Sequence, residues 1–248
     1  MAMQSYLALA GFAVRIGAVV LVIAWLWIGL RRAGLARDAR MTGIATTCCL
    51  LAWCAGAWLL ALSGFFASHV ALALPLCWGV CLIWMIPLLR SRSIGAALDS
   101  IPPWWLVALQ SYRFLAGVIW FGQLAAGRLP AEYAVRAGVT DGLVGLLAVV
   151  VAIWVYRGAT GWRVAAIAWN VFGLFDFAVG LDEAAMGLLS GAGFVGTFVP
   201  YALPYPVVMI PAFMAPLSTD LHVLSLRQLA RSIKREGHPA TPVSARAA

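Results

Sequence analysis

The chain has 248 residues, of which 64% are hydrophobic and only 10% are charged. Soluble domains carry about 25% charged residues, and a soluble fold of this length could not bury so much apolar side chain. The composition therefore excludes a soluble globular protein and predicts that lipid surrounds the chain. The formal net charge of +8 could suggest nucleic acid, but the distribution of the charge favours a membrane protein with no nucleic-acid partner.

A helix needs about 20 apolar residues to cross the hydrocarbon core of a bilayer. Seven segments approach that length, so the sequence predicts an all-α integral membrane bundle of seven transmembrane helices. In chain order they are 8–30, 43–63, 67–89, 104–126, 139–156, 164–183 and 203–226. Residues 1–226 are expected to form the transmembrane domain, and residues 227–248 a basic, mobile cytoplasmic tail that touches anionic lipid.

The connections between these segments differ in charge. Those on one side carry only Arg128 and Arg136. Those on the other side, together with the tail, carry Arg31, Arg32, Arg37, Arg40, Arg90, Arg92, Arg157, Arg163, Arg227, Arg231, Lys234, Arg235 and Arg246. Because basic connections remain in the cytoplasm, the N-terminus is predicted outside and the C-terminus inside. An odd number of spans agrees with this orientation.

Polar side chains within the predicted spans are expensive at membrane depth and so mark candidate sites. The candidates for a ligand or proton site are Gln110, Arg113, Asn170, Asp176, Asp220 and His222. A rise of about 1.5 Å per residue places Arg113 between the depths of Asp176 and Asp220, so Arg113 is predicted to pair with one of them. The alternative is structural, with these groups joining helices through hydrogen bonds and a buried ion pair.

Three other features receive simpler interpretations. Arg15 is expected to snorkel outward to the interface. Asp141, near the outer end of the fifth segment, is expected to be a boundary charge or a helix-start acid. Two small-residue pairs, Gly138–Gly142 and Gly187–Gly191, could serve helix packing.

The five cysteines fall in apolar stretches, unlike those of a secreted disulfide framework. Cys49, Cys54, Cys77 and Cys81 could form a Cu(I) or redox cluster, although buried cysteine is usually an inert small hydrophobe. No cofactor and no other metal site is expected. The only lysine, Lys234, lies in the tail, which excludes a retinal Schiff base in a membrane helix.

Three functions remain open. The first is a small-molecule permease or carrier, proton-coupled through Asp176 or Asp220, with a seventh helix kinked by Pro206, Pro211 and Pro216. The second is a membrane-embedded enzyme acting on a lipid or isoprenoid. The third is a structural subunit of a membrane complex. The sequence leaves the ligand, a small molecule or a lipid, and the oligomeric state undetermined.

In the enzyme hypothesis a buried carboxylic acid, Asp176, protonates an alkene or epoxide. Aromatic rings then face the developing cation, and the candidates are Trp120, Trp169, Phe172 and Phe175. The sequence has no DxxxD pair, HExxH or GxSxG motif, so an established diphosphate, metalloprotease or hydrolase site is not indicated.

Four stretches carry a family resemblance. They are residues 112–117 (YRFLAG), 127–145 (GRLPAEYAVRAGVTDGLVG), 168–180 (AWNVFGLFDFAVG) and the stretch with Pro211, His222 and Gln228. They resemble a group of small bacterial multi-pass membrane proteins of uncharacterised activity. The resemblance implies a protein of the bacterial inner (cytoplasmic) membrane and points to the same polar residues, but it implies no reaction.

Overall fold

The computed structural model describes residues 2–34, 36–190 and 201–237, and these ranges contain helices and no strand. The helices are α1 (Ala2–Arg32), α2 (Arg37–Leu62), α3 (Phe65–Ser68), α4 (Val70–Arg90), α5 (Arg92–Asp99), α6 (Trp104–Leu109), α7 (Tyr112–Ala125), α8 (Ala131–Tyr156), α9 (Trp162–Ser190), the π-helix η1 (Ile210–Met214) and α11 (Ala215–Gly237). The predicted all-α class is confirmed for this part of the chain.

Five of these helices are long and apolar enough to cross a membrane. They span Tyr6–Arg32, Arg37–Leu62, Val70–Arg90, Ala131–Tyr156 and Trp162–Gly180. Large apolar side chains on their outer faces are exposed, among them Leu59, Ile83 and Phe175. Such a continuous apolar exterior is what lipid-facing helices present, and the chain is a multi-pass membrane protein by these criteria.

The predicted fourth span, 104–126, is not one continuous helix. It consists of α6 and α7, joined at Gln110 and Ser111. Here the backbone is wound tightly: Arg113 N–H donates to the carbonyl of Gln110, and Phe114 N–H to that of Ser111, each three residues earlier. A tight turn of this kind inside a helix often marks a functional position, and it lies beside the candidate residue Arg113.

The predicted seventh span, 203–226, is also interrupted. Its second half begins with η1, which contains Pro211, and continues as α11, in which Pro216 is the second residue. Proline lacks an N–H and cannot complete the α-helical hydrogen-bond pattern, which accounts for the wider winding at this point. The segment is helical but irregular in its N-terminal half.

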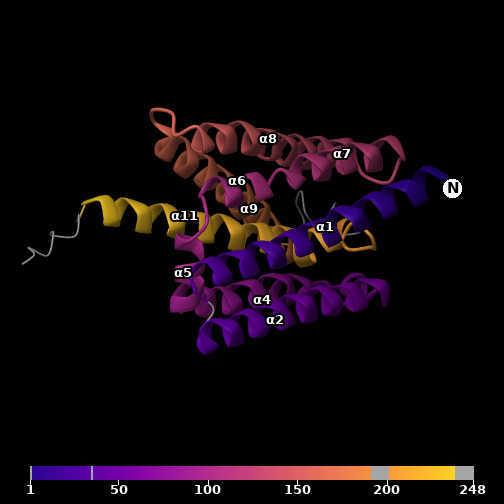
Figure 1. Ribbon diagram of the computed structural model, residues 1–248. Coiled ribbons are helices and arrows are strands. Elements are labelled where there is room, and N and C mark those ends of the chain that lie inside the picture. Colours follow the sequence, from indigo (N-terminus) through magenta and orange to yellow (C-terminus); the bar gives the residue numbers. More distant parts are fainter. Residues whose placement is uncertain (1, 35, 191–200, 238–248) are drawn as a thin grey trace, which may run out of the picture.

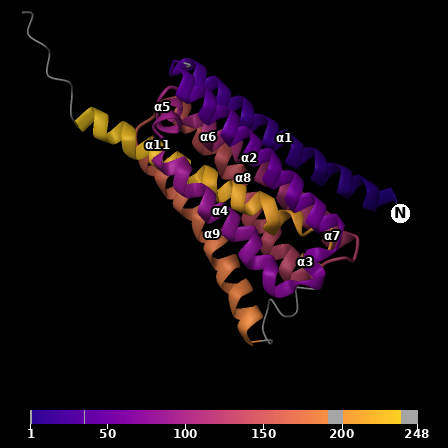
Figure 2. The same ribbon diagram turned by 90° about the horizontal axis from the view of Figure 1, so that it is seen from below.

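The helices lie in layers around α11 (Figure 1). In that view α7 and α8 form the upper layer, and α2 and α4 form the lower one. α1 crosses between the two layers, and the view from below shows α4 and α9 on the opposite side from α1 (Figure 2). The fold therefore surrounds one helix with the long apolar helices.

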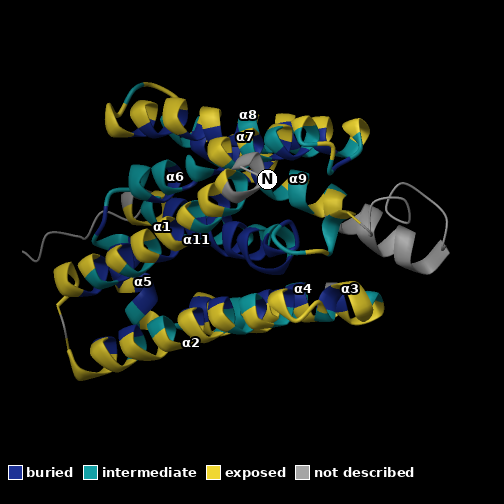
Figure 3. Cartoon of the chain, turned by 90° about the vertical axis from the view of Figure 1, so that its right-hand side faces the viewer, coloured by how far each residue is buried: buried dark blue, intermediate teal, exposed yellow. Residues whose placement is uncertain are grey.

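α11 is the most polar of these long helices, yet it is the buried one. Figure 3 shows it largely in the colour of buried residues at the centre of the bundle. Its buried polar side chains are Ser218, Asp220, His222, Ser225 and Gln228. A polar helix avoids lipid when other helices supply its hydrogen-bond partners, so the site is organised around α11.

α7 and α8 form the most extensive helix pair, and glycines allow their close approach. A Cβ added at Gly117 would lie 2.7 Å from the carbonyl oxygen of Gly138, and one at Gly145 would lie 2.0 Å from the backbone nitrogen of Phe114. The Gly138–Gly142 pair is therefore part of this interface, as small-residue packing predicts. Gly191, the second member of the other pair, lies outside the described residues.

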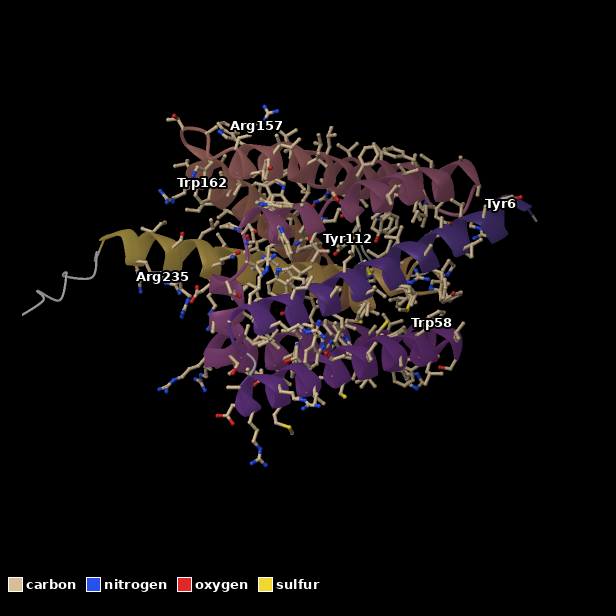
Figure 4. The ribbon with its side chains drawn as sticks, in the orientation of Figure 1. Tyr6, Trp58, Tyr112, Arg157, Trp162 and Arg235 are labelled. Atoms are coloured by element: carbon tan, nitrogen blue, oxygen red, sulfur yellow. The ribbon has the colours of Figure 1, made fainter. Side chains whose placement is uncertain are left out.

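The basic helix ends gather at one end of the bundle. α1, α4, α8 and α11 end there, and α2, α6 and α9 begin there (Figure 1). Arg157, Trp162 and Arg235 mark this end, whereas Tyr6 and Trp58 mark the opposite one (Figure 4). α11 continues to Gly237, so the first residues of the predicted tail are helical, while residues 238–248 lie outside the described part.

Candidate functional site

The centre of the candidate site is Arg113 on α7, held between two carboxylates from two other helices. Its Nε donates to Asp141 Oδ1 at 2.7 Å, and its Nη2 lies 2.7 Å from the same oxygen. Nη2 also donates to Asp176 Oδ2 at 2.5 Å. Arg113 is 1% exposed, so three helices converge on one buried cation.

Aromatic side chains enclose this charge cluster of Arg113, Asp141 and Asp176. Trp120 Nε1 donates to Asp141 Oδ2 at 2.8 Å, and the guanidinium carbon of Arg113 lies 4.3 Å from the ring centre of Phe177. Nη1 of Arg113 is buried without a hydrogen-bond partner in the described part of the chain. The cation–π contact with Phe177 offsets part of that deficit.

The structure corrects the interpretation of Asp141. A boundary charge or helix-start acid was expected, but Asp141 lies well inside α8 and pairs with Arg113. The glycine contact between Gly145 and Phe114 brings α8 against α7 next to Arg113, and this approach carries Asp141 into reach. The Gly138–Gly142 pair was the sequence signal that could have placed Asp141 at a helix interface.

The predicted pairing of Arg113 is met by Asp176, and Asp220 takes a different place. Asp220 on α11 accepts a hydrogen bond from Cys81 Sγ at 3.5 Å. It also lines a cavity of about 40 Å³ whose other walls include Trp25, Trp53 and Trp84. Asp220 is thus a separate buried acid in an otherwise apolar setting.

A second polar network joins α11 to α6 and α7. Gln110 Nε2 donates to the carbonyl of Ser218 at 2.9 Å, and Ser218 Oγ donates to Gln110 Oε1 at 3.0 Å. The Tyr112 hydroxyl is hydrogen-bonded to the same Ser218 hydroxyl. The tight turn at Gln110 therefore brings the side chains of Gln110 and Tyr112, on either side of Ser111, to one residue of the central helix.

A third network joins α11 to α9. His222 Nδ1 is hydrogen-bonded to Asn170 Oδ1 at 3.0 Å, and Asn170 Nδ2 donates to Ser225 Oγ at 3.0 Å. His222 Nε2 is buried without a partner among the described residues and faces Gly173, where an added Cβ would lie 2.3 Å away. Phe177 contacts both His222 and Arg113, so the third network adjoins the charge cluster.

At the basic end α11 is anchored to α5. Gln228 Nε2 donates to the carbonyls of Leu98 at 2.5 Å and Ile101 at 2.8 Å. Asp99 forms ion pairs with Arg231 and Arg235. The hydrogen bonds with Asp99 raise the pKa of the Arg231 guanidinium, so this side chain stays positively charged.

The cysteines do not form the suggested metal cluster in the described ranges. Cys49 is exposed, Cys54, Cys77 and Cys81 are buried, and all are free thiols. No group of three or more His, Cys, Asp or Glu side chains with the arrangement needed for a metal occurs in those ranges. The Cys81 thiol lies within hydrogen-bonding distance of the carbonyl of Pro216, at 3.4 Å, and of Asp220 Oδ1, at 3.5 Å.

Arg15 also departs from expectation. Instead of snorkelling outward it is 5% exposed, within the bundle and beside Tyr112 and Trp120 along one cavity. Arg15 therefore points into the bundle. The periodicity of the sequence did not reveal this direction, because α1 is apolar on all sides.

The arrangement as a whole places one cation between two anions inside the bundle. In their ionised forms these three side chains carry one net negative charge, which a proton or a bound cation would neutralise. His222, Asn170 and the Gln110–Ser218 pair lie around this cluster and offer hydrogen-bonding groups. The chemistry available is proton binding and the binding of a small polar ligand.

Comparison with known proteins adds a family but no activity. Residues 65–230 match the family described as a domain of unknown function (DUF8737). That range contains α3 to α9 and most of α11, and therefore every member of the charge cluster. No curated protein and no solved structure shows significant similarity to the chain. Since the match covers most of the sequence, the chain belongs to the DUF8737 family.

Proposed function

We propose that this chain is a seven-span carrier of a small solute in the bacterial cytoplasmic membrane, coupled to protons through the charge cluster of Arg113, Asp141 and Asp176. The observation that carries the proposal is the excess of one carboxylate over guanidinium in this buried cluster. Burying net charge in a low-dielectric interior costs several kcal/mol, so one carboxylate would hold a proton whenever no other cation is present. Loss and uptake of that proton would couple to solute binding.

The interrupted helices support a transport role. Discontinuous helices supply polar backbone and bending points near substrate sites in many transporters. Here the breaks at Gln110 and at η1 belong to two segments that are joined by the hydrogen bonds between Gln110 and Ser218. A shift of α11 relative to α7 would therefore change the hydrogen bonds of Gln110 and the surroundings of Arg113 together.

The count of spans and the orientation are part of the proposal. α6 with α7, and η1 with α11, each traverse the bundle as a composite segment beside the five long helices (Figure 1). Basic helix ends at the end marked by Arg157 and Arg235 favour a cytoplasmic location for that end. Single cysteines introduced at Thr160 and Arg128 in a cysteine-free background test this, because only the latter should react with an impermeant thiol reagent added outside.

The proton site is tested by infrared difference spectroscopy of the purified protein. Wild type should show the carbonyl band of a protonated carboxylic acid that is lost or shifted in Asp141→Asn or Asp176→Asn. Because Asp220 is a third buried acid, Asp220→Asn serves as the matched variant and should leave that particular band in place. A wild-type band unaffected by both cluster substitutions would reject the proton site.

Coupling itself is tested in proteoliposomes that contain a pH-sensitive dye. A panel of sugars, amines and short organic acids is added outside under an imposed pH gradient. A compound that moves protons with wild type should move none with Asp176→Asn. Solute-driven proton movement at the wild-type rate in that variant would remove Asp176 from the mechanism.

The enzyme hypothesis has less support from the geometry. Of the four aromatic side chains considered for a cationic intermediate, Phe172 and Phe175 are exposed on the outer face of α9, whereas Trp120 and Trp169 are buried. The tryptophan-lined cavity beside Asp220 measures about 40 Å³, too small for an isoprenoid chain.

A further inference from the structure

Arg15 on α1 is a second buried arginine, separate from the charge cluster. Its Nε and Nη2 atoms are buried and have no hydrogen-bond partner among residues 2–34, 36–190 and 201–237. No carboxylate among the side chains that the structure describes forms an ion pair with it. An uncompensated guanidinium at membrane depth is costly, so a negative charge beside Arg15 would stabilise the protein.

The neighbouring side chains do not supply that charge. Tyr205 and Cys54 are the residues whose polar groups act on the Arg15 guanidinium. A phenol and a thiol exchange hydrogen bonds as neutral groups at physiological pH. They can orient Arg15, but they leave its positive charge in place.

Arg15 lines a cavity of about 40 Å³ between α1, α7 and the segment that leads into α11. Its polar walls include Tyr112, Trp120 and Gln123, and none of the described residues lining it is acidic. One water molecule needs about 10–15 Å³ of such space, so the cavity holds roughly three to four water-sized atoms. Tyr112 marks this region near the middle of the bundle (Figure 4).

We propose that the Arg15 cavity is a binding site for a small monovalent anion, a halide, nitrate or short carboxylate. Nε–H and one Nη2–H of a guanidinium form a fork that binds two oxygens of one oxyanion or converges on one halide. The anion balances Arg15, and the apolar walls contributed by Ala116 and Ile210 exclude bulk water. The volume restricts the ligand to about four heavy atoms.

This site does not depend on the proposed transport of a solute or on protonation of the charge cluster. It does adjoin the cluster, because Trp120 lines the cavity and donates Nε1 to Asp141. A bound anion is therefore separated from Asp141 by one indole ring.

The experiment is a thermal unfolding series in mild detergent at constant ionic strength, in which sodium gluconate is replaced by sodium chloride, nitrate, formate or acetate. Gluconate is too large for the cavity and serves as the reference anion. The Tm of wild type should rise with the logarithm of the concentration of the small anion, as linkage requires. In Arg15→Met the dependence should vanish, and the Tm in gluconate should equal or exceed that of wild type, because an unpaired charge has been removed.

Arg157→Met is the matched control, since Arg157 is exposed at the basic end of the bundle, away from the cavity (Figure 4), and its loss should leave the anion dependence intact. Ala116→Met is a second variant that fills the cavity and retains Arg15, and it too should abolish the dependence. Direct binding of radioactive chloride to the folded protein gives a measurement independent of stability, with an affinity loss of at least about tenfold expected in Arg15→Met. Equal responses to gluconate and to all four small anions in wild type, or an undiminished response in Arg15→Met, would overturn the proposal.

Discussion

Arg113 and Trp120 each donate a hydrogen bond to a different oxygen of the Asp141 carboxylate. Nε of Arg113 donates to Oδ1 at 2.7 Å, and Nε1 of Trp120 donates to Oδ2 at 2.8 Å. Both donors are on α7, seven residues apart, and therefore on one face of that helix. Asp141 thus has a partner for each oxygen, which leaves Asp176, bonded through Oδ2 alone in the described contacts, as the carboxylate better placed to exchange a proton.

Removal of the cation should be strongly destabilising. Arg113→Met leaves Asp141 and Asp176 facing each other without compensation, and breaking a buried ion pair in this way costs about 3–5 kcal/mol. The free energy of unfolding measured in mixed detergent micelles should fall by that order. The double variant Arg113→Met/Asp141→Asn should recover a large part of the loss, and a double variant as unstable as the single one would contradict the charge argument.

Among the glycines between α7 and α8, Gly145 allows the closest approach. In Gly145→Ala the new methyl group would overlap the backbone nitrogen of Phe114, which must move the helices apart and cost about 1–3 kcal/mol. Gly142→Ala is the control in the same helix, because nothing lies within 4 Å of a Cβ added there. That control should be neutral or slightly stabilising, and equal losses for the two variants would show that the contact is unimportant.

Ser218 should contribute more than an ordinary helix serine. Ser218→Ala removes the hydroxyl shared by Gln110 and Tyr112 and leaves both without that buried partner, with an expected loss of about 1–2 kcal/mol. Thr219→Ser keeps a hydroxyl that can bond to the carbonyl of Ala215 and should change stability little. Thermal unfolding of both variants in one detergent provides the comparison.

Gly173 provides the space occupied by His222. In Gly173→Ala the added methyl would lie 2.3 Å from Nε2, so the imidazole must turn and its bond to Asn170 should weaken. We expect a loss of about 1–3 kcal/mol and a changed imidazole resonance in the NMR spectrum. Gly180→Ala, on the same helix with open space around it, should change neither, and an unaltered imidazole signal in Gly173→Ala would place His222 elsewhere.

Composition and apolar length were enough to identify a multi-pass helical membrane protein. These properties depend only on how many consecutive side chains prefer lipid to water, which a sequence states directly. The fourth and seventh segments were harder, because hydropathy does not register the tight turn at Gln110 or the π-helix at η1. In the last segment, Pro211 and Pro216 did indicate an irregular helix.

The candidate site was predicted in part. Estimated depth, which helical rise supplies, predicted that Arg113 pairs with Asp176 or Asp220, and the structure has Asp176 in that place. Asp141 and Arg15 were assigned to the membrane boundary. Depth gives one coordinate of a residue but not the neighbour that its helix faces. α8 packs against α7 because glycines allow the two backbones to approach closely. This packing brings Asp141 to Arg113.

The sequence by itself determined that this protein lies in a membrane, that it is helical, and that arginine and aspartate inside it must compensate each other's charge. The tertiary structure decided which acid meets which base, and that the most polar helix, α11, stands at the centre of the bundle. The reason is physical: the cost of exposing a charge to lipid is a property of the residue, whereas its compensation depends on partners far away in the chain.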